Sequence, residues 1–165
     1  MKIRRTLQKN ILLAGFYGGM AEVVWVAVYC LLTGRSGAEV AQQVTATLLP
    51  DLAGGSAAVP AGIAIHFVLA LLLAMAYVRL VWQPLARHLS GAAGTIVACA
   101  ALAVVWATNF FLVLPAVNPA FVALLPYGAT LVSKLLFGVA MAGALQDRLR
   151  EGIAHDSLGL PHGAH

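Results

Sequence analysis

Four polar side chains that could do chemistry lie inside long apolar stretches of this sequence: Glu22, His66, Asn109 and Lys134. Each falls in a different stretch, and Glu22 and Lys134 lie near the middle of theirs. A carboxylate can bind a cation or carry a proton, a lysine can serve as its counter-ion, and a histidine titrates in the physiological pH range. The asparagine amide donates and accepts hydrogen bonds. Together they predict a polar centre inside an apolar protein.

The pair Glu22 and Lys134 carries the strongest prediction. Ser133 and Lys134 lie in an apolar segment long enough to cross a bilayer, which places the lysine near its middle depth. A charge at that depth costs about 3 kcal/mol unless an anion or water compensates it. Two interpretations stay open. The pair is either an ion- or solute-binding site, with Lys134 as counter-ion and switch, or a structural ion pair that holds the helices in register.

Helical spacing adds supporting residues on the same faces as the pair. Tyr29 shares the face of Glu22, and Tyr127 and Thr130 share that of Lys134. His66 lies in a stripe of small residues, and it is interpreted mainly as a hydrogen-bonding group between helices. Asn109 receives the same interpretation. The supporting polar set is therefore Tyr29, His66, Asn109, Tyr127 and Thr130.

Other kinds of site are not expected from this sequence. Only one histidine lies in an apolar stretch, so bis-histidine haem ligation is not supported, and no zinc, nucleotide-binding or nucleophile motif is present. Cys30 and Cys99 lack a metal-ligand spacing and are interpreted as small apolar side chains. We therefore expect no metal, no cofactor and no nucleic-acid partner, and no motif here favours enzyme activity.

Composition explains which elements must position these residues. The 165 residues are 61% hydrophobic and 10% charged, with a mean hydropathy of +0.90. Soluble domains carry about 25% charged residues, so this composition predicts a polytopic membrane protein in contact with the lipid bilayer. The fold class is all-α, a bundle of four transmembrane helices. Their predicted bounds are about 11–32, 58–82, 92–114 and 121–145.

The remaining segments are assigned around this membrane domain, residues 11–147. Residues 1–10 form a basic N-terminus ahead of an uncleaved first span. A helix over about 38–50 is too short and too polar to span, which predicts an interfacial or re-entrant element. Residues 148–165 form a polar tail that is expected to be disordered.

Basic residues predict the orientation. Eight of them fall on one side of the four predicted spans, whereas Arg35 falls on the other. The positive-inside rule then places both termini in the cytoplasm of a bacterial inner-membrane protein. The eight are Lys2, Arg4, Arg5, Lys9, Arg79, Arg87, Arg148 and Arg150.

Two runs carry a resemblance to a known group of proteins: VAQQVTATLLP, and NFFLVLPAVNPAFVALLPYGATLVSKLLFG. They resemble segments of small four-span bacterial inner-membrane proteins, mostly uncharacterised, some of which are labelled sodium:proline symporter-like. The resemblance covers most of residues 11–147 and implies a four-span fold. It brings no established activity, and sodium/solute symporters have many more spans than this chain.

Two functions compete at this point. The first is small solute or ion transport through a polar pathway at Glu22, His66 and Lys134, which calls for a homo-oligomer because one four-helix bundle leaves little room. The second is an accessory or structural subunit of a larger membrane complex, for example a respiratory one, in which the polar centre serves packing.

Overall fold

The structure, a computed structural model, describes the backbone of residues 2–85, 89 and 91–157, and the side chains of 7–85, 89 and 91–147. The described chain is helical throughout, with turns and no strand. Four helical segments are long and apolar enough to cross a membrane: Leu7–Thr33, Ala58–Leu85, Gly91–Val117 and Tyr127–Asp147. The predicted all-α class with four membrane-spanning helices is therefore confirmed.

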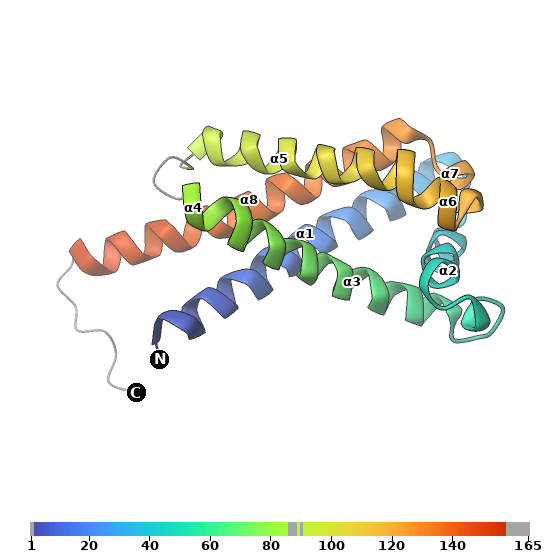
Figure 1. The fold of residues 1–165 in the computed structure, drawn as a ribbon, viewed down its shortest axis with the longest axis horizontal. Coiled ribbons are helices and arrows are strands. Elements are labelled where there is room, and N and C mark those ends of the chain that lie inside the picture. Colours follow the sequence, from blue (N-terminus) through green and yellow to red (C-terminus); the bar gives the residue numbers. More distant parts are fainter. Residues whose placement is uncertain (1, 86–88, 90, 158–165) are drawn as a thin grey trace.

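The two central helices are the first and the last. Helix α1 (Lys2–Thr33) crosses α8 (Tyr127–Ser157), and this is the most extensive helix contact of the fold (Figure 1). Helix α3 (Ala58–Tyr77) packs on α1, and α5 (Gly91–Thr108) packs on α8. The order across the bundle is therefore α3, α1, α8, α5, so the two outer helices are held apart by the central pair.

Short helices cover one end of this bundle, which we call the α2–α7 end. Helix α2 (Gly37–Leu48) packs on α3, and α7 (Pro119–Leu124) packs on α2. The start of α1 and the end of α8 lie at the opposite, terminal end (Figure 1). Ser36 and Glu39 have the spacing of a capping box, and the Ser36 hydroxyl accepts the Glu39 N–H at 3.3 Å. This cap explains why α2 starts where it does.

The predicted element at about 38–50 is therefore a helix, with bounds of Gly37–Leu48 and a 3-10 turn at Pro50–Leu52 after it. Thr45 fixes it to the next helix, because its hydroxyl donates to the Ala58 carbonyl at 2.6 Å. A Cβ at Gly62 would collide with the carbonyl oxygen of Ala41. Glycine is needed there because α2 and α3 approach backbone to backbone.

Pro84 and Pro115 lie where the sequence predicts that the second and third spans end. The helices instead continue past both prolines, each with a wider turn just before the proline. The π-helical segments Val78–Trp82 and Asn109–Val113 each stop just before a proline-containing turn, at Gln83–Leu85 (α4) and Leu114–Val117 (α6). In both, the residue before the proline donates its N–H to the carbonyl five positions back. A proline ring clashes with the carbonyl four positions back and offers no N–H, and a wider turn relieves both problems.

Two boundaries differ from the predicted ones. The fourth span begins at Tyr127 and not near 121, because Leu125 is extended (φ −124°, ψ 136°), as the residue before a proline prefers. Residues 121–124 belong instead to α7. At the other end α8 continues to Ser157, ten residues beyond the predicted end of the membrane domain at 147 and into the predicted tail. Residues 158–165 of that predicted tail lie outside the described part of the chain.

Two apolar clusters flank a polar layer. The larger lies in the terminal half of the bundle, and the smaller, at the α2–α7 end, is built on Cys30, Val40 and Leu125. The larger cluster reaches up to Phe137 on α8 and Ala70 on α3, within about one turn of Lys134 and His66. Its buried members are Ile11, Ala14, Ala70, Ala74, Tyr77, Val78, Trp82, Leu89, Ala98, Leu102, Phe137, Met141, Ala142 and Leu145.

Candidate functional site

The centre of the candidate site is an ion pair between the two central helices. Lys134 Nζ on α8 lies 2.8 Å from Glu22 Oε1 and 2.9 Å from Oε2 on α1, so the ammonium contacts both carboxylate oxygens. The Glu22 side chain is 6% exposed and that of Lys134 18%. The sequence predicted this pair from depth alone, and the structure brings the two groups together.

A hydroxyl completes the coordination of the carboxylate. Ser133 Oγ lies 3.0 Å from Glu22 Oε1 and 3.0 Å from the carbonyl oxygen of Thr130. A hydroxyl has one proton to donate, so Ser133 serves one acceptor at a time. On the other side, Lys134 Nζ lies 5.7 Å from the ring centroid of Phe137. The pair therefore has a hydroxyl on one side and an aromatic face on the other.

Two indoles fix the α8 turn that carries these groups. Trp25 Nε1 on α1 donates to the Ala129 carbonyl at 2.8 Å, and Trp106 Nε1 on α5 donates to Thr130 Oγ1 at 3.0 Å. Each half-buried indole N–H thus has an acceptor, as tryptophan usually finds inside a protein. Thr130, predicted as a supporting residue, therefore acts by joining α5 to α8.

His66 lies beside the pair without bonding to it. Its Nε2 is 3.1 Å from the Gly19 carbonyl on α1, one turn before Glu22. Because a carbonyl only accepts, Nε2 carries the proton in this contact. The imidazole also packs edge-on against Phe67, with centroids 5.5 Å apart. This geometry matches the interpretation of His66 as a group that bonds one helix to another.

Asn109, the fourth predicted polar residue, begins the second π-helical segment. It is half-buried, and its side chain makes no hydrogen bond with any residue whose side chain the structure describes. Its carbonyl instead accepts the wide-turn bond from Leu114 N–H in the π-helical segment. No described hydrogen bond therefore links the Asn109 side chain to the other three polar groups, and its place among them stays a prediction. The proline-induced widening of this turn gives the residue a backbone role that helical spacing does not predict.

The two tyrosines of the predicted set lie toward the α2–α7 end. Tyr29 packs on Trp25 with centroids 6.5 Å apart, and it borders the smaller apolar cluster. Tyr127 is 45% exposed, and its ring packs edge-on or tilted against those of Trp106, Phe110 and Phe111, with centroids 5.3–6.3 Å apart. Neither hydroxyl bonds to the ion pair. Both rings form an aromatic layer between the pair and that end of the bundle.

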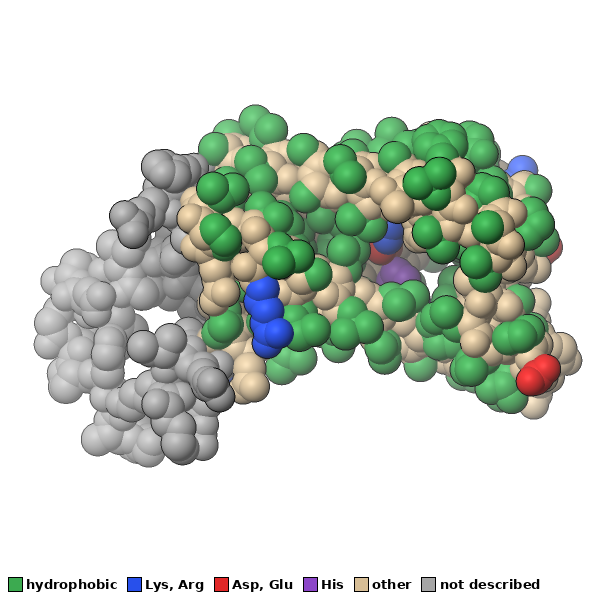
Figure 2. Space-filling view, in the orientation of Figure 1, with side chains coloured by type: hydrophobic (Ala, Val, Ile, Leu, Met, Phe, Trp, Pro, Cys, Tyr) green, Lys and Arg blue, Asp and Glu red, His purple; other side chains and the backbone are tan. Residues whose placement is uncertain are grey.

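The polar centre is open on one side of the bundle. Figure 2 shows basic, acidic and histidine side chains together at the bottom of a hollow, with many hydrophobic side chains on the face around it. The hollow lies where α3 and α5 are held apart by α1 and α8. Since Lys134 is three times as exposed as Glu22, the lysine is the member of the pair nearer this opening.

The arrangement can exchange a charge but lacks a metal-binding set. Within the described side chains, histidine, cysteine, aspartate and glutamate nowhere gather in threes. A proton or a cation that binds Glu22 would compete directly with the ammonium of Lys134, because that ammonium occupies both carboxylate oxygens. The chemistry available is thus protonation or cation exchange at one carboxylate.

One polar contact was missed from the sequence. Asn118 Nδ2 lies 3.0–3.2 Å from the Gln43 carbonyl, Gln43 Oε1 and Thr47 Oγ1, and Asn118 Oδ1 accepts the Phe121 N–H at 3.2 Å. This asparagine caps α7 and joins it to α2. The signal was present, because an asparagine before a proline is a typical helix start.

Comparison of the chain with protein-family models, with curated proteins and with solved structures gives no match. The chain is a multi-pass membrane protein by the length and apolar composition of its four helices.

Proposed function

We propose that this protein transports an ion or a small polar solute, and that the Glu22–Lys134 pair is its binding centre. The observation that carries the proposal is the position of the pair. It lies between two apolar clusters, yet at the bottom of a hollow that is open between α3 and α5. A pair that served packing alone would be expected to be enclosed on all sides, because exposure adds nothing to a structural contact.

The proposed step is an exchange of counter-ions. When a proton or a cation binds Glu22, the carboxylate loses its attraction for Lys134, and the ammonium then needs another anion or water. Either would reach Lys134 through the hollow between α3 and α5. Because Glu22 lies on α1 and Lys134 on α8, the exchange would also alter the contact between the two central helices.

A second candidate, a subunit of a larger membrane assembly, is favoured by one observation. Only 17% of the apolar window in Gly91–Val117 is buried, compared with 39% in Tyr127–Asp147. The large exposed side chains of the former include Ile96, Val104 and Leu112. A partner helix or a second copy of the chain could cover this face, and a homo-oligomer would serve both candidates.

The membrane and the orientation belong to the same proposal. The excess of lysine and arginine at one side of the spans supports a bacterial inner membrane with both termini in the cytoplasm. The α2–α7 end would then face the periplasm. The resemblance to small four-span bacterial proteins supports this location but no particular substrate.

Flux measurements on purified protein in liposomes test the proposal. Vesicles loaded with a pH-sensitive or a sodium-sensitive dye report movement of protons or of sodium after a gradient is imposed. We expect wild-type flux above that of protein-free vesicles, and loss of at least nine-tenths of it (about tenfold) in Glu22→Gln, because the amide cannot exchange a charge.

The matched control is Glu39→Gln, which neutralises an exposed carboxylate on α2. This variant should keep wild-type flux. Wild-type vesicles that carry neither ion faster than protein-free ones would count against ion transport. A stoichiometric foreign subunit retained after mild-detergent extraction would favour the second candidate instead.

A further inference from the structure

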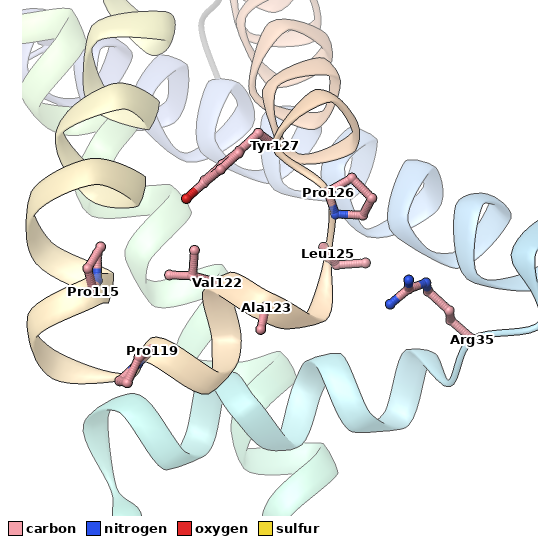
Figure 3. A pocket seen from close by; sticks show the side chains of 8 residues that line it. All are labelled: Arg35, Pro115, Pro119, Val122, Ala123, Leu125, Pro126 and Tyr127. Carbon is pink, nitrogen blue, oxygen red and sulfur yellow. The ribbon is translucent and has the colours of Figure 1, made fainter.

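A pocket at the α2–α7 end lies apart from the ion pair. It has a volume of about 470 Å³ and lies between the turn after α1, the α6–α7 segment and the start of α8. Figure 3 shows Arg35 entering from one side and the ring of Tyr127 lying over the other, with Pro115, Pro119 and Val122 forming apolar walls. One cation in an apolar pocket is the feature that calls for an explanation.

The backbone holds Arg35 in a defined position. Gly34 takes a positive φ of 68° and ends α1, and the Arg35 N–H then donates to the Cys30 carbonyl at 2.9 Å. This is the 6→1 bond of a Schellman motif. Ser36 follows at once as the N-cap of α2. Arg35 is therefore set between two helix ends and is not part of a long loop.

The Arg35 side chain has donors to spare. One guanidinium nitrogen, Nη1, donates to the Leu124 carbonyl. A guanidinium has five N–H groups, and among the described residues no carboxylate forms an ion pair with it. Glu39 and Asp51, the two acidic residues that follow Arg35 most closely in the sequence, are exposed and form no ion pair with it. The positive charge in the pocket is thus left uncompensated by the described chain.

The position of the pocket relative to the bilayer indicates which anion it binds. Arg35 follows the last residue of the first membrane-spanning segment, Thr33, by two positions. At about 1.5 Å per helical residue this places it at the edge of the hydrocarbon layer, where phospholipid headgroups lie. Arginine binds phosphate through two parallel N–H donors, and tyrosine is favoured at this depth because its hydroxyl reaches polar headgroups.

We propose that this pocket binds the phosphate of an anionic phospholipid through Arg35, while the Tyr127 hydroxyl, which lies across the pocket from the guanidinium in Figure 3, donates to another polar atom of the same headgroup. The apolar walls would contact the glycerol and the first acyl carbons. A zwitterionic choline headgroup fits less well, because its quaternary ammonium would lie near the guanidinium. Free phosphate shares the recognised group but offers nothing for the apolar walls.

Native mass spectrometry of the detergent-purified protein tests this proposal, with phosphatidylglycerol as the probe and phosphatidylcholine as the reference lipid. We expect wild type to retain phosphatidylglycerol at least fivefold more than phosphatidylcholine. Arg35→Gln should abolish this preference, and Tyr127→Phe should reduce it about twofold. Arg35→Lys, which keeps the charge and loses the two-donor geometry, should fall between wild type and Arg35→Gln.

The matched control is Arg79→Gln, an exposed arginine at the other end of the bundle. It should leave the preference unchanged, and circular dichroism should show that all variants keep their helices. Equal retention by wild type and Arg35→Gln, or an equal loss in Arg79→Gln, would overturn the proposal. Displacement of the lipid by millimolar inorganic phosphate would assign the site to free phosphate and overturn the lipid assignment.

Discussion

Two polar contacts join distant parts of this molecule, and they differ in charge and not in burial. Glu22 and Lys134 connect α1 to α8 by an ion pair, whereas Asn118 connects α7 to α2 by neutral hydrogen bonds. Counted over the whole residue, side chain and backbone together, Glu22 is 5% exposed and Asn118 9%. Since both are buried, the difference between them lies in what happens when one partner changes its charge.

The ion pair can be switched by a change of charge, whereas the neutral Asn118 contact can only be broken. The amide of Asn118 has no second charge state, so α2 and α7 stay joined at any ordinary pH. The ion pair changes with the binding of one proton or cation to Glu22, and a lone charge left inside the bundle is strongly unfavourable. The neutral contact therefore suits a fixed end of the bundle, and the charged one suits a moving or binding centre.

The largest effect is expected from removal of one member of the ion pair. Glu22→Gln leaves Lys134 unpaired, and Lys134→Met leaves Glu22 unpaired, so each should lower the free energy of unfolding by about 3–5 kcal/mol. The double variant should recover most of that loss. Thermal unfolding in detergent of wild type, the two single variants and the double variant measures the interaction between the two residues. Glu39→Gln is the control and is expected to have a wild-type Tm.

A steric change at the α2–α7 end should have the next largest effect. In Gly62→Ala the new methyl group collides with the Ala41 carbonyl, and separating the two backbones should cost about 1–3 kcal/mol. Gly143→Ala, on α8 with open space around its Cβ position, is the matched control and should be neutral or slightly stabilising. Equal Tm changes in the two variants would contradict the close approach of α2 to α3.

The neutral contact itself is tested by Asn118→Ala. The change removes the α7 cap and the bonds to Gln43 and Thr47, at a cost of about 1–3 kcal/mol. Because the contact lies at one end, hydrogen exchange should rise in 37–48 and 119–124 and stay unchanged in α1 near Glu22. Faster exchange across the whole bundle would show that the two contacts are not independent.

The smallest effect is expected at Ser133. Ser133→Ala removes one of three contacts to the Glu22 carboxylate and leaves the ion pair in place, so the loss should be about 1 kcal/mol. Making Ser133→Ala in the Glu22→Gln background isolates the Ser133–Glu22 hydrogen bond. The Tm loss there should be smaller than in the wild-type background, because a neutral amide is stabilised less than a carboxylate by a hydroxyl donor. A loss as large as that of Glu22→Gln would mean that Ser133, and not Lys134, chiefly stabilises the carboxylate.

Much of the fold and the central pair could be predicted from the sequence. The four long apolar stretches form the four candidate membrane-spanning helices. They could be recognised because a helix that crosses a bilayer needs about 20 apolar residues in a row, and few segments of a chain meet that requirement by chance. Glu22 and Lys134 could be paired because a charge at mid-depth needs an opposite one nearby. Both inferences rest on large energetic costs: that of exposing polar backbone to the bilayer and that of leaving a charge unpaired inside it.

The remaining features depend on packing details that spacing does not contain. The position of Asn109 follows from a helix widened ahead of Pro115, which rotates the residues on one side of the π-helical segment relative to those on the other. Asn118 bonds to Gln43 and Thr47, more than 70 positions away, and nothing local identifies these partners. The opening between α3 and α5 depends on which helices are central, and that order is a tertiary property.

The central claim is that the ion pair works as a binding centre and does not serve packing alone. The double variant Glu22→Gln with Lys134→Met tests it most directly, since it removes both charges and leaves neither unpaired. Its Tm and its proton or sodium flux in liposomes should be measured on the same preparation. We predict a Tm close to that of wild type and a flux close to that of protein-free vesicles. A double variant that keeps wild-type flux would contradict the claim and leave the pair with a structural role.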